Sequence, residues 1–177
     1  GGLNRINFNA DGYEVNPVII SPERKTQLNQ NLMLFFTGFS RFSSDIQQTT
    51  EKALVDKQKQ LLEMLSLVDD AEKVLTSKTD LNEFGRLLDY TWKLKRGISN
   101  RISTDSIDGL YAKGIAAGAL GGKLLGAGGG GFLLFYVEPD KQEAVHKAME
   151  ELLYVPFEFE NSGTRVIHYT PETYEKR

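Results

Sequence analysis

The sequence contains no cysteine, one tryptophan and five prolines among its 177 residues. The lack of cysteine excludes disulfides, thiol catalysis and cysteine-ligated zinc within this chain, and it fits a cytoplasmic protein. No apolar run approaches the ~20 residues that a membrane-spanning helix requires. The longest run, Phe132 to Val137, has the length of a strand. No signal-peptide pattern is visible either, so we expect a cytoplasmic location and no membrane partner.

No charge of one sign dominates the chain. It has 21 Lys and Arg against 24 Asp and Glu, a net charge of -3, and therefore shows no basic footprint for nucleic acid. Its length suffices for one domain with a substantial core or for two small ones. The chain opens on glycine rather than methionine, and its first residues already have a strand pattern. We therefore expect a fragment or processed product of a longer protein.

The N-terminal part of the chain changes from strand patterns to a helical one. Residues 4–20 are typical of two strands around a tight turn at the Asp-Gly pair of residues 11–12. The apolar run of residues 32–37 predicts a buried strand. From about Asp45 to Val68, apolar residues recur at three, four and seven spacings, which predicts a long amphipathic helix.

Two further helices are expected before residue 120. One covers residues 81–95, with Asp80 as its N-cap. The other begins near Asp105 and ends at Gly118, a residue that favours the C-terminal cap position.

The last third of the chain has a predominantly strand pattern. A short strand, a glycine loop and a strong strand ending at Val137 precede a helix over residues 141–153. Two further strands are expected over residues 155–160 and 164–169, with a turn at residues 161–163. The order predicts an α+β fold, a ferredoxin-like β-α-β-β-type antiparallel sheet packed with several helices and preceded by an N-terminal β-hairpin.

The stretch GGKLLGAGGGGFLLFYV has five glycines among the six residues from Gly126 to Gly131. Glycine loses more backbone entropy on folding than any other residue, so a run this dense implies a functional reason. Gly126, Gly128 and Gly131 satisfy G-x-G-x-x-G, but a strand follows where the dinucleotide fingerprint requires a helix. A Walker A loop is excluded because Leu124 stands where serine or threonine is needed.

With these two motifs excluded, the interpretation that remains is a loop between two strands whose backbone carries almost no side chains. Successive N–H groups without side chains can line a concave site for an anion. The alternative is a wide hairpin loop that binds nothing. The residues favour the anion site and leave the identity of the anion open.

Several segments resemble the GHMP kinases, the superfamily of galactokinase, homoserine kinase, mevalonate kinase and phosphomevalonate kinase. GALGGKLLGAGGGGFLLFYV, residues 118–137, resembles the third conserved motif of that superfamily. FFTGFSRFSSDI, residues 35–46, resembles the strand and loop that open its C-terminal half. DYTWKLKRGIS (89–99) with STDSIDGLYAKGIAAGA (103–119) resembles the branch of sugar 1-kinases that act on heptose 7-phosphate, to which L-fucokinase is more distantly related.

The resemblance implies a domain arrangement. Residues 1–30 would be the hairpin and connection from an N-terminal kinase domain, and residues 31–177 the C-terminal domain. The family's P-x-x-x-G-L-[GS]-S-S loop for the ATP phosphates is missing, because Ser43-Ser44 lacks the preceding glycine pattern. That loop, the metal-coordinating groups and the aspartate near the acceptor hydroxyl are therefore expected upstream, and this chain alone is expected to be inactive.

The activity that the resemblance implies is phosphoryl transfer from Mg-ATP to the anomeric (1-) hydroxyl of a sugar phosphate. The expected substrate is D-glycero-D-manno-heptose 7-phosphate, in the synthesis of nucleotide-activated heptose for cell-surface glycans. ATP and Mg²⁺ would be bound mainly by the N-terminal kinase domain. Another GHMP small-molecule kinase, such as a fucokinase or galactokinase-like enzyme, and a non-catalytic ligand-binding or regulatory module are the alternatives, and a homodimer stays open.

The resemblance also implies which residues of this chain shape the phosphate and sugar pocket. No catalytic residue and no metal ligand is nominated in this chain. Trp92 is expected in the core, and His146 and His168 are expected to have no catalytic or metal role. The phosphate- and substrate-binding candidates are Gly126, Ala127, Gly128, Gly129, Gly130, Gly131, Lys123 and Arg41.

The basic candidates each have a second interpretation. Lys123 would contact substrate phosphate or be a solvated lysine at the end of a strand. Arg41 would bind a phosphate or sugar hydroxyls, or be a surface arginine of a loop. Lys93, Lys95 and Arg96 form a basic cluster that favours compensation of the helix dipole over recognition of the 7-phosphate.

Overall fold

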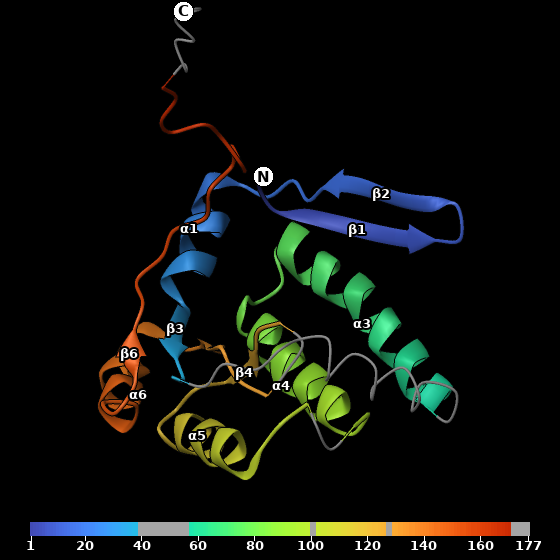
Figure 1. Cartoon of the computed structure of the whole chain (residues 1–177). Helices are drawn as coiled ribbons and strands as arrows, with labels where there is room; N and C mark the ends of the chain where they lie inside the picture. Colours follow the sequence, from blue (N-terminus) through green and yellow to red (C-terminus); the bar gives the residue numbers. More distant parts are fainter. Residues whose placement is uncertain (39–56, 100–101, 127–128, 171–177) are drawn as a thin grey trace, which may run out of the picture. The chain divides into compact units, whose positions relative to one another are not determined.

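The computed structural model describes residues 1–38, 57–99, 102–126 and 129–170 (Figure 1). The chain divides into two compact units, residues 20–157 and the remaining residues at the two ends. None of the helices in the described residues is both long and apolar enough to cross a bilayer. The assignment of residues 1–30 to a connection from an upstream domain stays a prediction.

The unit of the chain ends contains the expected hairpin. Strand β1 (Asn4–Asn9) pairs antiparallel with β2 (Gly12–Pro17), and Asn9 lies opposite Gly12. The two-residue turn is therefore Ala10-Asp11, one residue earlier than the sequence predicts. Gly12 still supplies the positive φ, +150°, but as the first residue of β2.

The larger unit is built on a four-stranded antiparallel sheet. Its strands are β3 (Leu32–Phe36), β4 (Gly121–Leu124), β5 (Phe132–Tyr136) and β6 (Leu153–Tyr154), in the spatial order β4-β5-β3-β6. All neighbours are antiparallel. The first and third strands are central and the second and fourth lie at the edges, which is the ferredoxin-like order and confirms the predicted α+β class.

Helices cover this sheet and close its core. They are α1 (Pro22–Gln30), α3 (Gln58–Thr76), α4 (Asn82–Arg96), α5 (Asp105–Ala116), a short 3-10 turn η2 (Pro139–Lys141) and α6 (Gln142–Ala148). Helix α4 packs on β4 and β5, and α3 packs on α4 (Figure 1). Phe35, Leu133 and Phe135 of the central strands are fully buried, and Trp92 joins them from α4.

The N-terminal helices differ from the expectation in two places. Helix α1 has no counterpart in the predicted elements, because Leu28 is its only buried residue and gives no apolar periodicity. Its signal is local: Ser21 caps the helix and Pro22 opens it. The predicted start of the long helix at Asp45 lies outside the described residues, and α3 continues beyond Val68 to Thr76.

The ends of α4 and α5 illustrate two kinds of capping. At α4 the capping residue is Leu81 rather than Asp80, whose carboxylate instead accepts a hydrogen bond from the Asn82 amide at 3.0 Å. At α5 the prediction is confirmed. Gly118 has a φ of +116°, and the Ala119 amide donates to the Gly114 carbonyl at 3.1 Å, which completes a Schellman motif.

The C-terminal expectations are partly wrong. The predicted helix over residues 141–153 is shorter, ending at Ala148. Residues 155–160 and 164–169 form no strands. Among the described residues, the outer side of β3 pairs with the two-residue strand β6 and accepts one further hydrogen bond, from the Val155 amide to the Leu34 carbonyl. Pro156 comes next and has no N–H to donate, so the ladder stops there.

Two glycines allow α4 to approach β4 closely. A methyl group on Gly121 would collide with the Gly85 carbonyl of α4 and come within 2.7 Å of the Asp89 amide. A methyl group on Gly85 would come within 2.7 Å of the Tyr136 ring. The side-chain-free contact therefore sets the distance between this helix and this strand.

We expect Gly121→Ala to lower the free energy of unfolding by about 3 kcal/mol, because neither backbone can yield locally. Urea unfolding of the protein measures the loss. Gly109→Ala is the matched control, since Gly109 is an exposed residue of α5 and a methyl group there meets nothing within 4 Å. It should raise the free energy of unfolding by about 0.5–1 kcal/mol. A Gly121→Ala midpoint equal to that of the unmodified protein would contradict the close approach.

Candidate functional site

The glycine loop joins two antiparallel strands, as the sequence predicts. Its base is closed by a hydrogen bond from the Leu125 amide to the Phe132 carbonyl at 2.8 Å. Gly126, Gly129 and Gly131 have φ values of +85°, +74° and +107°. Side chains are disfavoured at such values, so the loop requires glycine for its path as well as for its space. Ala127 and Gly128 lie outside the described residues.

Two neighbouring segments hold the loop in place. The Gly129 amide donates to the Ile102 carbonyl at 3.0 Å, and Gly129 is buried. The Gly131 carbonyl accepts from both the amide and the Oγ1 of Thr37, each at 2.9 Å. The loop is thus anchored to the connection between α4 and α5 on one side and to the end of β3 on the other.

The anchoring leaves part of the loop backbone for a ligand. The amides of Gly130 and Gly131 donate to no acceptor within the described part of the chain. The backbone alternates between positive φ at Gly129, negative φ at Gly130 and positive φ at Gly131. An alternation of the sign of φ is a feature of nests, in which successive N–H groups turn toward one anion.

Two lysines lie at the base of the loop. The Nζ of Lys95, on α4, donates to the Gly126 carbonyl at 2.9 Å. Burial lowers the pKa of Lys95, and the positive charge of Lys123 lowers it further. Burial also lowers the pKa of Lys123, on β4. Both ammonium groups are therefore partly withdrawn from water next to the glycine loop.

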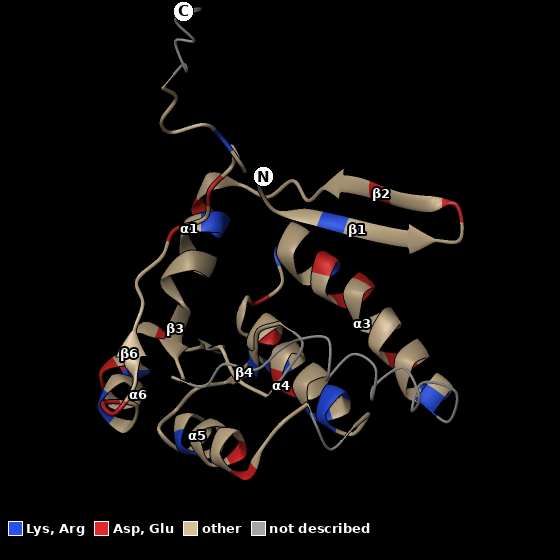
Figure 2. Ribbon diagram, in the orientation of Figure 1, with Lys and Arg blue, Asp and Glu red and all other residues tan. Residues whose placement is uncertain are grey.

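The other cations at the end of α4 are neutralised by carboxylates. Lys93 Nζ lies 2.6 Å from Asp89 Oδ2. An Arg96 guanidinium nitrogen lies 2.8 Å from Asp108 Oδ1. Figure 2 shows acidic and basic residues interspersed along α4 and α5. The basic cluster of the sequence thus separates into two ion pairs and one lysine that faces the loop.

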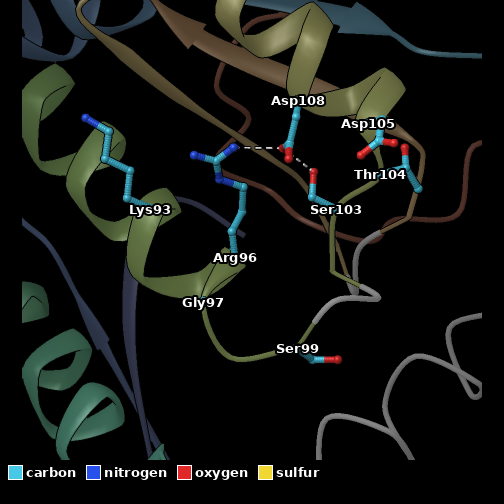
Figure 3. Close-up of a pocket in the computed structure, with 8 residues that line it drawn as sticks. All are labelled: Lys93, Arg96, Gly97, Ser99, Ser103, Thr104, Asp105 and Asp108. Carbon is cyan, nitrogen blue, oxygen red and sulfur yellow. Dashed lines mark hydrogen bonds and ion pairs between the residues drawn. The ribbon is translucent and has the colours of Figure 1, made fainter.

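A polar pocket of about 440 Å³ lies between the end of α4 and the start of α5 (Figure 3). The Asp108 carboxylate, which lines this pocket, accepts one hydrogen bond from Arg96 at 2.8 Å and another from Ser103 Oγ at 2.7 Å. Arg96 also stacks on the rings of Trp92 and Tyr111. The pocket is lined by Lys93, Arg96, Gly97, Ser99, Ser103, Thr104, Asp105 and Asp108. It neighbours the glycine loop, because Ile102 in the same connection accepts the Gly129 amide.

A family model described as GHMP kinases C terminal matches residues 67–155, just over half of the chain. The chain belongs to the GHMP kinase family. It is 33% identical over 170 residues to D-glycero-alpha-D-manno-heptose 7-phosphate kinase of Campylobacter jejuni, covering 93% of this chain and 50% of that protein. It is 24% identical over 142 residues to the bifunctional fucokinase/GDP-fucose pyrophosphorylase of Arabidopsis thaliana, covering 78% and 13%.

The fold of this GHMP kinase chain also matches solved structures. A crystal structure of mevalonate kinase from L. major in complex with R-mevalonate superposes with a TM-score of 0.69 at 21% identity, covering 85% of this chain and 45% of that one. The chain thus spans about half the length of the Campylobacter protein and less of the others. The likeness to mevalonate kinase shows a shared fold.

The structure describes some, but not all, of the site residues that the sequence predicts for this GHMP kinase chain. The described glycines and Lys123 lie together at one end of the sheet, whereas Arg41 lies outside the described residues. Trp92 is buried, with 1% of its surface exposed, which confirms its place in the core. His146 packs edge-on against the rings of Phe35 and Tyr154.

Sequence reasoning did not single out the contacts that anchor the loop. Thr37 and Ile102 have no pattern that associates them with residues 126–131, which lie far along the chain. Lys95 appears in the sequence only as one of three adjacent cations. What distinguishes Lys95 from Lys93 and Arg96 is the side of α4 on which it lies, since Lys95 reaches the loop that follows β4.

Proposed function

We propose that the chain is the C-terminal half of an ATP-dependent kinase that phosphorylates the anomeric hydroxyl of D-glycero-D-manno-heptose 7-phosphate. The observation that carries the proposal is the anchored glycine loop, in which two amides have no acceptor among the described residues, together with a half-buried lysine on an adjoining strand. The identity to the Campylobacter heptose 7-phosphate kinase supports the sugar. The cytoplasmic location and a homodimer stay predictions.

Phosphoryl transfer depends mainly on positioning and on neutralising the charge of the transferring group. The loop backbone would lie beside the ATP phosphates held by an upstream domain, where any side chain would occupy the space of the facing loop. Lys123 would contact a substrate phosphate, and Arg41 a phosphate or sugar hydroxyls. Mg²⁺, bound with ATP mainly by the upstream domain, would neutralise charge on the transferring phosphate.

A substrate screen of the intact protein tests this proposal. We expect Mg-ATP-dependent transfer to heptose 7-phosphate with a higher kcat/KM than to fucose, galactose or mevalonate, and NMR should locate the new phosphate on the anomeric carbon. Preferred transfer to fucose or galactose would support the fucokinase or galactokinase-like alternative. Ligand binding without any transfer would support the non-catalytic module.

A further inference from the structure

Helix α4 runs alongside β4 and carries Lys95 to the base of the glycine loop. The helix contacts the β4 segment and the loop at two places. Gly85 lies against Gly121, and Lys95 donates a hydrogen bond to the Gly126 carbonyl. The ten helical steps from Gly85 to Lys95 rise about 15 Å, and β4 from Gly121 to Leu124 spans about 10 Å before the chain continues into the loop at Gly126. The two elements therefore stay aligned from the first contact to the second.

This alignment also places Lys123 beside α4. Alternate residues of a strand point to the same face, so Lys123 shares the face of Gly121, which is the face that α4 covers. Lys123 thus lies between the helix and the strand, close enough for its charge to act on Lys95. Neither lysine forms an ion pair with a carboxylate of the described residues.

Two ammonium groups brought together in a half-buried place repel each other, and an anion bound between them would remove this repulsion. Lys93 and Arg96, one turn or less away, each have a carboxylate, so acidic partners are available on these elements and are used elsewhere. The amides of Gly130 and Gly131 lie at the same base of the loop, because the Leu125–Phe132 hydrogen bond closes it.

We propose that Lys95 and Lys123, together with the Gly130 and Gly131 amides, bind one phosphate dianion. The inference rests on the proposed function and deepens it by adding Lys95 as a binding residue. The shared chemistry is a phosphate group with two negative charges, which two cations and a nest of amides match. Its source is either the phosphate already on the sugar or a phosphate of the nucleotide.

The test compares Lys95→Met and Lys123→Met with a matched control in the intact protein. Methionine keeps the apolar stem and removes the charge. Lys113→Met is the control, since Lys113 is an exposed lysine of α5 that pairs with Glu151 at 2.5 Å and lies outside the proposed site. We expect each test variant to raise one KM by about 10- to 100-fold, and the control to leave it within about twofold.

The two KM values identify the source of the phosphate. A rise in the KM for the sugar phosphate alone assigns the site to the sugar, and a rise in the KM for ATP alone assigns it to the nucleotide. Lys95→Arg keeps the charge and should retain most of the affinity. A thermal midpoint near that of the control shows that the methionine variants are folded. Folded variants with both KM values unchanged overturn the inference and leave the proposed kinase intact.

The phosphate site can also be tested if the proposed kinase activity is not found. If the unmodified protein transfers no phosphate to any sugar, the proposed function fails. Calorimetric titration with inorganic phosphate and pyrophosphate then tests the lysines directly. Binding that weakens about tenfold or more in both methionine variants supports the site, and binding that is absent or unchanged overturns it.

Discussion

Replacing Gly129 with valine in the proposed full-length kinase is expected to lower kcat/KM by at least about 100-fold, the loss that a small misplacement of a reacting group produces. Gly129 has a φ of +74°, which a β-branched residue essentially never adopts. It is also buried, with its amide bonded to the Ile102 carbonyl. Valine therefore forces the loop off its anchor and moves the Gly130 and Gly131 amides.

A second glycine separates loss of function from loss of stability. Gly118→Val introduces the same kind of backbone strain at φ +116°, at the end of α5 and outside the loop. A Cβ at residue 118 would lie 3.1 Å from the Cβ and Cγ of Lys141, which must shift by a few tenths of an ångström. This control should lose about 1–2 kcal/mol of stability and keep its activity. Near-normal kinetics in a folded Gly129→Val protein would show that the loop merely connects β4 and β5.

Residues 1–177 by themselves are expected to transfer no phosphate from ATP, whereas the proposed kinase, which includes an upstream half, is expected to do so. The reason is chemical: this sequence contains no serine- and glycine-rich loop for the ATP phosphates. The glycine loop, Lys95 and Lys123 can neutralise charge, but they supply no group that would hold the adenosine end of the nucleotide.

An ADP-release assay measures this difference. Circular dichroism and a cooperative urea transition first establish that the isolated chain is folded. Sustained turnover by the folded chain alone, with heptose 7-phosphate and Mg-ATP, would place the chemistry in this half and refute the assignment. A protein that contains both the upstream half and this chain should release ADP at a rate well above the background of the assay.

Local patterns predict most elements of the larger unit. The span of α4 and the Gly118 cap of α5 follow from apolar spacing and from one residue's conformational preference. The strands around the glycine loop follow from their apolar runs. The strands expected from residue 155 onward do not form, because alternation describes a strand's faces but not its partner, and Pro156 ends the pairing with β3.

The sequence likewise predicts one part of the candidate site, whereas the other part depends on the tertiary structure. Five glycines in six residues specify a tight, side-chain-free bend wherever they occur, so the sequence alone determines that the loop exists and which family it resembles. Only the tertiary structure selects Lys95 from three neighbouring cations and associates it with Lys123. That selection depends on how far α4 runs along β4, a distance set by the Gly85–Gly121 contact between residues 36 positions apart in the chain. Backbone preferences act between neighbours in sequence, whereas charge pairing depends on distance in space.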